Sequence, residues 1–135
     1  RAKTEGKQIL ELESVAYQYE LLSQVFENDE DAFLNHTLNE IDEMDETMRI
    51  IFDSWCSGDE SGLAGLFQKA YESSPAGRVI KQELMITRNY NMALKIKDWL
   101  DSGQNYFVIV GAGHLVGDEG VVALLQREGY RAKQL

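Results

Sequence analysis

The chain has 135 residues, 44% of them hydrophobic, so we expect residues 1–135 to form a single domain. Thirteen basic and 23 acidic residues give a formal net charge of -10, which disfavours binding to nucleic acid or to an anionic membrane surface. One cysteine and two histidines exclude an intrachain disulfide framework, a cysteine cluster for zinc and an all-histidine metal site within one chain.

No stretch of the sequence approaches the roughly 20 apolar residues of a transmembrane helix. The first residues, "RAKTEGKQ", are polar and carry no apolar targeting segment. Because the chain begins on arginine rather than methionine, we expect a processed product or a fragment, and an export signal could precede Arg1. The sequence leaves the compartment open, with an exported or periplasmic parent protein as one option.

The first predicted element is a short strand over residues 8–12, "QILEL". A helix follows, because Val15, Tyr19 and Leu22 recur at helical spacing. A longer helix is predicted from about residue 31 to residue 56, and its apolar seam consists of Leu34, Leu38, Ile41, Met44, Met48, Ile51 and Trp55. The carboxylates beside that seam, at Asp42, Glu43, Asp45 and Glu46, lack the glycine turn of a calcium loop, so we interpret them as a solvated face.

Two more helices are predicted from capping signals. Gly58 ends the long helix, and Asp59 caps the next one. Ser74 and Pro75 then read as the N-cap and first position of a helix that extends to about residue 101. Arg88 falls on the largely apolar stripe of this helix, so it must be paired or face a cleft.

The C-terminal residues predict a strand, a helix and a strand. The strand over 105–110 is apolar throughout from Phe107 to Val110, the helix over 118–128 ends at Gly129, and residues 130–135 form the last strand. The order of elements predicts an α/β fold with a small parallel or mixed sheet. In this fold residues 14–102 form a large all-helical crossover, and residues 105–135 form the C-terminal strand–helix–strand unit.

The stretch "GAGH" at 111–114 follows the apolar strand, and three interpretations are open for it. A dinucleotide loop is disfavoured, because Val116 replaces the third glycine and acidic residues at 118 and 119 would face the phosphate. His114 is either part of a plain turn or a functional group, since ligands of open α/β sheets collect at the carboxyl ends of strands.

Arg88 also has two interpretations. It either forms a buried salt bridge, with Glu13 or Glu83 as candidate partners, or presents its guanidinium to a carboxylate, phosphate or oxyanion in a cleft. Asn89 follows it, and an asparagine inside a helix is unfavourable unless its amide is used.

Three motifs together resemble a known family: "LES" with Gln18 five residues after Glu13, then "TRNYNMALKI", then "YFVIVGAGHLVGDEGVVALLQREGYRAKQL". In this order they resemble the C-terminal half of the TraB/PrgY/GumN family, which includes the Tiki proteases. The resemblance implies half of an α/β fold shared with erythromycin esterases and ChaN-like lipoproteins. It also implies a metal-dependent hydrolase of the peptidase type, whose cofactor would be a divalent metal such as Mn, Co or Zn.

The resemblance implies roles for individual residues. His114, Arg88 and Glu13 would be catalytic, His114 would also bind the metal, and Asn89, Gly111 and Gly113 would contact substrate. Family members carry two G-x-x-H motifs, and only the second, Gly111 to His114, is present here. "FLNH" at 33–36 lacks the glycine and lies on a predicted helix, so His36 is not a candidate.

Because only one of the two G-x-x-H motifs is present, we expect the chain to be inactive as a monomer. The partners expected from the resemblance are the missing N-terminal half of the parent protein and a peptide substrate. In isolation we expect a homo-oligomer, formed through sheet edges or apolar helical faces. Two alternatives are a peptide or pheromone-binding module without catalysis, and haem or iron binding by analogy with the ChaN-like relatives.

Overall fold

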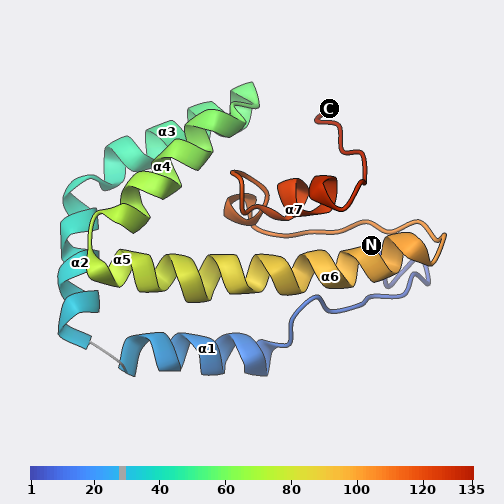
Figure 1. Cartoon of the computed structure of the whole chain (residues 1–135), viewed down its shortest axis with the longest axis horizontal. Helices are drawn as coiled ribbons and strands as arrows, with labels where there is room; N and C mark the ends of the chain where they lie inside the picture. The colour runs from blue at the N-terminus through green and yellow to red at the C-terminus, as the bar shows by residue number, and fades with distance from the viewer. Residues whose placement is uncertain (28–29) are drawn as a thin grey trace.

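A continuous helical rod runs through the middle of the molecule (Figure 1). The computed structural model describes residues 1–27 and 30–135. The rod contains α5 (Pro75–Ile80), the π-helix η1 (Lys81–Ile86) and α6 (Thr87–Asp101). It begins as the sequence predicts, because the Ser74 hydroxyl accepts the Gly77 N–H at 2.9 Å and Pro75 is the first helical residue.

The π-helix η1 interrupts the rod immediately before Arg88 and Asn89. Its wider winding ends at Thr87, whose backbone N–H bonds to the Gln82 carbonyl five residues earlier. The Thr87 hydroxyl donates to the same carbonyl at 3.0 Å. As a result, the first turn of α6 starts with a different phase from the one that a regular helix over 76–101 would give it.

The predicted helix over 31–56 is two helices, α2 (Glu30–Asp42) and α3 (Met44–Ser57), with a break at Glu43. The break follows no proline or glycine, and the predicted seam does not form a core. Its residues Leu34, Leu38, Ile41, Met44, Met48 and Trp55 are each more than half exposed. The neighbouring carboxylates at 42, 43, 45 and 46 are exposed, which confirms their interpretation as a solvated face.

α3 and α4 (Glu60–Glu72) form a helical hairpin, and α1 (Val15–Glu27) packs along the opposite side of the rod (Figure 1). The turn of the hairpin is the predicted one. Gly58 adopts a left-handed conformation with φ +71°, and the Asp59 carboxylate accepts the Gly62 N–H at 2.9 Å.

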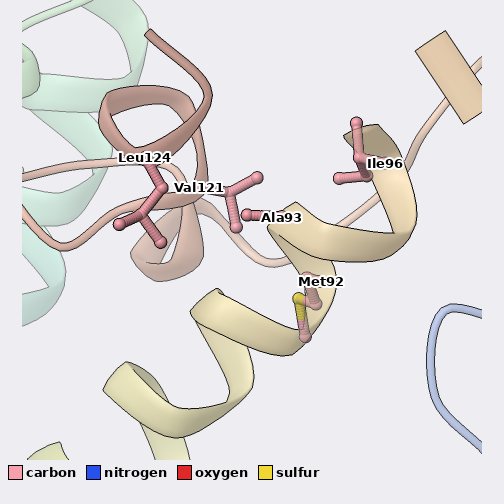
Figure 2. Close-up of a cluster of buried hydrophobic side chains, with 5 residues drawn as sticks. All are labelled: Met92, Ala93, Ile96, Val121 and Leu124. Atoms are coloured by element: carbon pink, nitrogen blue, oxygen red, sulfur yellow. The ribbon is translucent and has the colours of Figure 1, made fainter. Parts of the chain in front are cut away.

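The apolar core lies where α6 packs against α7 (Val121–Arg127) (Figure 2). Its buried members are Met92, Ala93, Ile96, Val121 and Leu124. Leu12 and Val110 pack against this cluster from the segments that precede α1 and the 3₁₀ turn η2 (Ala112–His114). The core therefore brings together three segments that are far apart in the sequence.

The predicted sheet is wrong. Residues 8–12, 105–110 and 130–135 form no strand, and none is present in the part of the chain that the structure describes. A strand needs a neighbour for its N–H and C=O groups, and no backbone hydrogen bond joins any two of these three segments. The α/β fold, and with it half of an erythromycin esterase or ChaN-like sheet, is replaced by an all-helical arrangement.

The helices are also too short or too polar to span a bilayer, as far as the described residues go.

Candidate functional site

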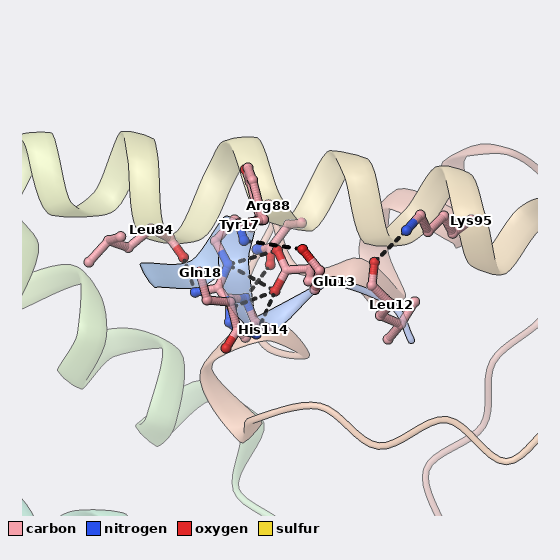
Figure 3. A network of polar contacts seen from close by, with 10 residues as sticks. Leu12, Glu13, Tyr17, Gln18, Leu84, Arg88, Lys95 and His114 are labelled. Carbon is pink, nitrogen blue, oxygen red and sulfur yellow. Dashed lines mark hydrogen bonds and ion pairs between the residues drawn. The ribbon is translucent and has the colours of Figure 1, made fainter. Parts of the chain in front are cut away.

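Four of the candidate residues from the sequence lie together beside the start of α6, and we call them the cluster: Glu13, Arg88, Asn89 and His114. Figure 3 shows Arg88 reaching from the central rod toward Glu13, with His114 beside that carboxylate. Glu13 lies directly before α1, where the Ser14 hydroxyl accepts the Tyr17 N–H at 3.1 Å and starts the helix. His114 ends the 3₁₀ turn η2, and Asn89 follows Arg88 in α6.

Glu13 and Arg88 form a largely buried ion pair. Arg88 Nη2 donates to Glu13 Oε2 at 2.7 Å, and Nε donates to Oε1 at 2.9 Å. The side chains are 18% exposed for Arg88 and 6% exposed for Glu13. This two-point geometry fixes both side chains across 75 residues of sequence.

Two further contacts complete the pair. Arg88 Nη1 donates to the Leu84 carbonyl of η1 at 3.1 Å, and Gln18 Nε2 donates to Glu13 Oε2 at 3.2 Å. A guanidinium carries five N–H groups, so two of those on Arg88 have no acceptor among the described residues.

The pair keeps Glu13 ionised. Burial raises the pKa of Glu13, but the hydrogen bonds from Arg88 and Gln18 and the charge of Arg88 outweigh it and bring the pKa below its usual value. The hydrogen bond to Glu13 raises the pKa of Arg88. Both groups are therefore charged at neutral pH.

Asn89 fixes the tautomer of His114. The Asn89 amide nitrogen donates to the Glu119 carbonyl at 2.8 Å, so its oxygen is the atom that faces His114 Nδ1 at 2.6 Å. An amide oxygen can only accept, and Nδ1 must therefore carry the proton. In the neutral ring this leaves Nε2 with a lone pair, ready to accept a proton or to bind a metal.

His114 is neutral at physiological pH. Burial and the nearby charge of Arg88 lower its pKa, while the Glu13 carboxylate opposes that shift. A neutral, buried imidazole with a defined tautomer is the form required of a general base.

The sequence of the chain matches the model of the TraB/PrgY/gumN family over residues 1–134, which is almost its entire length. The chain belongs to the TraB/PrgY/gumN family. Among curated proteins it is similar to metalloprotease TIKI2 of Danio rerio, with 36% identity over 56 residues, or 40% of this chain and 11% of the relative. It is also similar to metalloprotease TIKI1 of Xenopus tropicalis, with 38% identity over 52 residues, or 37% of this chain and 10% of the relative.

The matched region spans about a tenth of the length of these relatives. No solved structure matches the chain. The TraB-family assignment therefore rests on the sequence, and the helical arrangement is described from this chain alone.

The two glycines of this TraB-family motif differ in what they do. Gly111 has φ −63° and a Cβ there would meet only the His114 ring at 3.9 Å, an ordinary contact. At Gly113 a Cβ would approach Met85 Cε to 3.2 Å and Phe67 to 3.4 Å, so only the bare backbone fits well. Neither has a positive φ; in this stretch of the chain Gly117 has one, at +79°.

The residues present do not by themselves make a metal centre. No group of three or more His, Cys, Asp or Glu side chains that could hold an ion exists in the described part of the chain. Glu13 already accepts hydrogen bonds from Arg88 and Gln18. Among these four side chains, His114 Nε2 is therefore the one atom left to bind a metal. A catalytic zinc site, for comparison, uses three protein ligands.

Two supporting contacts of the site were not predicted. The Leu84 carbonyl, which anchors Arg88, is placed by the π-helix, and no residue pattern in the sequence marks that winding. Lys95 Nζ donates to the Leu12 carbonyl at 2.7 Å and holds the segment that carries Glu13 (Figure 3). A lysine two turns after Arg88 is a weak signal, because most such residues are solvated.

Proposed function

We propose that this chain contributes His114 and its supporting residues to the hydrolytic site of a longer peptidase-like protein. The observation that carries the proposal is the fixed Nδ1–H tautomer of His114, which leaves Nε2 unprotonated next to an ionised carboxylate. The similarity to two proteins named metalloproteases supports the same class of reaction.

The chemistry follows from the four side chains. Nε2 of His114 removes a proton from water, and the resulting imidazolium is stabilised by the Glu13 carboxylate and held in place by Asn89. In this proposal the two N–H groups of Arg88 that have no acceptor among the described residues donate to the developing oxyanion. Such a base accelerates hydrolysis by about 10²–10⁴-fold.

No step is assigned to a metal, because the described residues contain no group of three or more His, Cys, Asp or Glu side chains that could hold one. If Mn, Co or Zn takes part, it binds His114 Nε2 and draws its other ligands from residues outside this chain. The 135 residues alone are then inactive, and the missing N-terminal half of the parent completes the site.

The test compares variants of the longer parent protein. Peptide-library cleavage is measured with Mn²⁺, Co²⁺ or Zn²⁺ added in turn. We expect His114→Ala to lower the rate at least about 100-fold, the range of a lost general base. His36→Ala is the matched control and should retain the rate, because His36 contacts Ser74 outside the cluster. Equal rates for the two variants, or no cleavage by the unmodified parent, would reject the proposal.

A binding module without catalysis is the second candidate. It is favoured by the mutual neutralisation of Glu13 and Arg88, the arrangement of a structural ion pair. In that case a peptide or pheromone would bind tightly to the parent and be recovered intact by mass spectrometry after prolonged incubation, with or without added metal.

A further inference from the structure

A hollow of about 450 Å³ is lined in part by Asn89, the neighbour of Arg88 in α6. It lies between α4, the π-helix η1 and the loop that follows His114, and its wall includes Phe67, Tyr71, Met85, Gly113, Gly117 and Arg127. Its volume falls within the roughly 300–1,000 Å³ typical of ligand sites.

One part of the wall of the hollow, formed by Phe67, Tyr71, Met85 and Gly113, is apolar and closely built. The rings of Phe67 and Tyr71 stack with centroids 6.3 Å apart. Gly113 brings bare backbone against Phe67 and Met85, where even a methyl group would be tight. An apolar side chain entering here would meet aromatic and thioether surface on two sides.

The rim of the hollow is polar and electrically balanced. Lys81 Nζ and Glu119 Oε2 are 3.8 Å apart, and neither the Asp118 nor the Arg127 side chain makes a hydrogen bond or ion pair with another described residue. Burial raises the pKa of Tyr71, whose phenol stays protonated. Equal numbers of cationic and anionic groups disfavour a phosphate or another polyanion. Free donors and acceptors around an apolar floor match a peptide, with its backbone at the rim and a side chain inside.

The hollow is continuous with the candidate site. Asn89 lines it and also accepts the hydrogen bond from His114, and Gly113 lines it directly before His114 in the chain. Two neighbouring residues of one extended peptide can therefore contact the hollow and the His114 imidazole at the same time.

We propose that this hollow binds a large apolar side chain of an extended peptide, next to the residue that the peptide presents to His114. The inference rests on the proposed function and deepens it, because it names the side-chain class that the site selects. Phe, Met and Leu side chains fit the floor, whereas Lys or Glu would leave a charge against Phe67 and Met85.

The test is a titration that requires no catalysis. The ¹⁵N-labelled chain is titrated with N-acetyl-Gly-Gly-Phe-Gly-Gly-amide and with the same peptide carrying Ala in place of Phe. Saturable shifts are expected for the amides of Gly113 and Gly117 and for the Asn89 side chain. The Phe peptide should bind at least about tenfold more tightly, because its ring is removed from water.

Three variants make the result specific. Ala64→Phe fills the hollow from α4 and should abolish the shifts, while Ala16→Phe on the exposed face of α1 should leave them unchanged. Gln68→Trp, at the exposed rim, serves the same purpose if Ala64→Phe does not fold.

The inference is overturned if the Phe peptide gives no saturable shifts, if both peptides bind equally, or if the shifts map to α2 and α3. Binding is measured without hydrolysis. If the Phe peptide binds in the hollow but the parent protein cleaves no peptide, only the proposed function is rejected. An active parent whose hollow binds nothing would reject only the inference.

Discussion

The pair of Glu13 and Arg88 ties the N-terminal segment to the central rod through side chains that are nearly hidden from water. Removing one partner of such a pair leaves the other charge buried without compensation. We expect Glu13→Gln, which preserves the volume of the side chain, to lower the free energy of unfolding by about 3 kcal/mol in urea titrations.

The control for this substitution is Glu46→Gln. Glu46 also pairs with an arginine, Arg49, at 2.6 Å, but both side chains are more than half exposed. Water screens that pair, so its loss should change the unfolding midpoint very little. Equal destabilisation by the two substitutions would show that burial of Glu13 does not determine its contribution.

The tautomer of His114 depends on a single amide. In Asn89→Leu both Nδ1–H of His114 and the Glu119 carbonyl lose their partner. Long-range ¹H–¹⁵N correlation spectra of the unmodified chain should show Nδ1 protonated and Nε2 bare, and those of the variant a mixture of tautomers. A protonated Nε2 in the unmodified chain at neutral pH would contradict the assigned base.

The residues of this cluster can be predicted from the sequence, but most of the contacts between them cannot. Spacing marks Arg88 as an arginine on an apolar stripe, and Glu13 is one of the partners proposed for it from the sequence. The bond between Asn89 and His114 depends on how the chain returns from residue 102 to residue 114. That path is set by core packing of Val110 and by a turn with no regular period, so local patterns do not encode it.

At the level of whole elements, helix ends are predictable because their signals are local. The side chains of Ser74 and Asp59 each accept a backbone N–H three residues later and so cap the start of a helix. Gly58 ends a helix in a left-handed conformation, and all three residues act as the sequence predicts. Residues 105–110 satisfy the composition of a buried strand equally well. A strand, however, exists only beside a partner, and in this fold Phe107 and Ile109 are 90% and 79% exposed.

Glycines test the packing of individual elements. At Gly120, the N-cap of α7, a Cβ would come within 2.6 Å of the Val116 carbonyl oxygen and 2.7 Å of that of Leu115. Because backbone cannot move aside cheaply, Gly120→Ala should lower the free energy of unfolding by about 2 kcal/mol.

The matched substitution is Gly65→Ala, inside α4, where a Cβ would meet nothing within 4 Å. It should stabilise the chain by about 0.5–1 kcal/mol, because alanine favours the helix. Thermal melts followed by circular dichroism measure both changes. Destabilisation by Gly65→Ala of the same size would mean that the α3–α4 hairpin packs differently from its arrangement here.

For the molecule as a whole, the cluster makes stability depend on pH. Burial and Arg88 lower the pKa of His114, so the unfolded chain takes up a proton at a higher pH than the folded chain does. The contribution of His114 is complete above about pH 6.5 and is lost as the pH falls below it. The lowered pKa of Glu13 has the same sign, and its contribution is lost below about pH 4.3.

Urea titrations between about pH 8 and pH 5 measure the first of these losses. His114→Gln should flatten the decline over this interval. A decline that persists unchanged in His114→Gln would show that other groups carry the pH dependence.

The molecule also leaves a broad apolar surface uncovered. We call the side chains of Leu34, Leu38, Ile41, Met44, Met48 and Trp55 the α2–α3 face, and each is more than half exposed. So many large apolar side chains exposed on two consecutive helices favour an association surface over an isolated monomer. Of the two routes to association expected from the sequence, sheet edges and apolar helical faces, the absence of strands in the described residues leaves the second.

We therefore expect the isolated chain to dimerise at micromolar concentration through the α2–α3 face. The net charge of -10 opposes association, so added salt, which screens repulsion and strengthens apolar contact, should raise the dimer fraction. Met48→Glu places a carboxylate in the centre of the face and should give monomers in sedimentation velocity runs. Lys133→Gln lowers the net charge by the same single unit in the exposed C-terminal segment and should remain dimeric if the face drives association rather than charge alone. A monomeric mass at both low and high salt would show that exposure of this face is not sufficient for pairing.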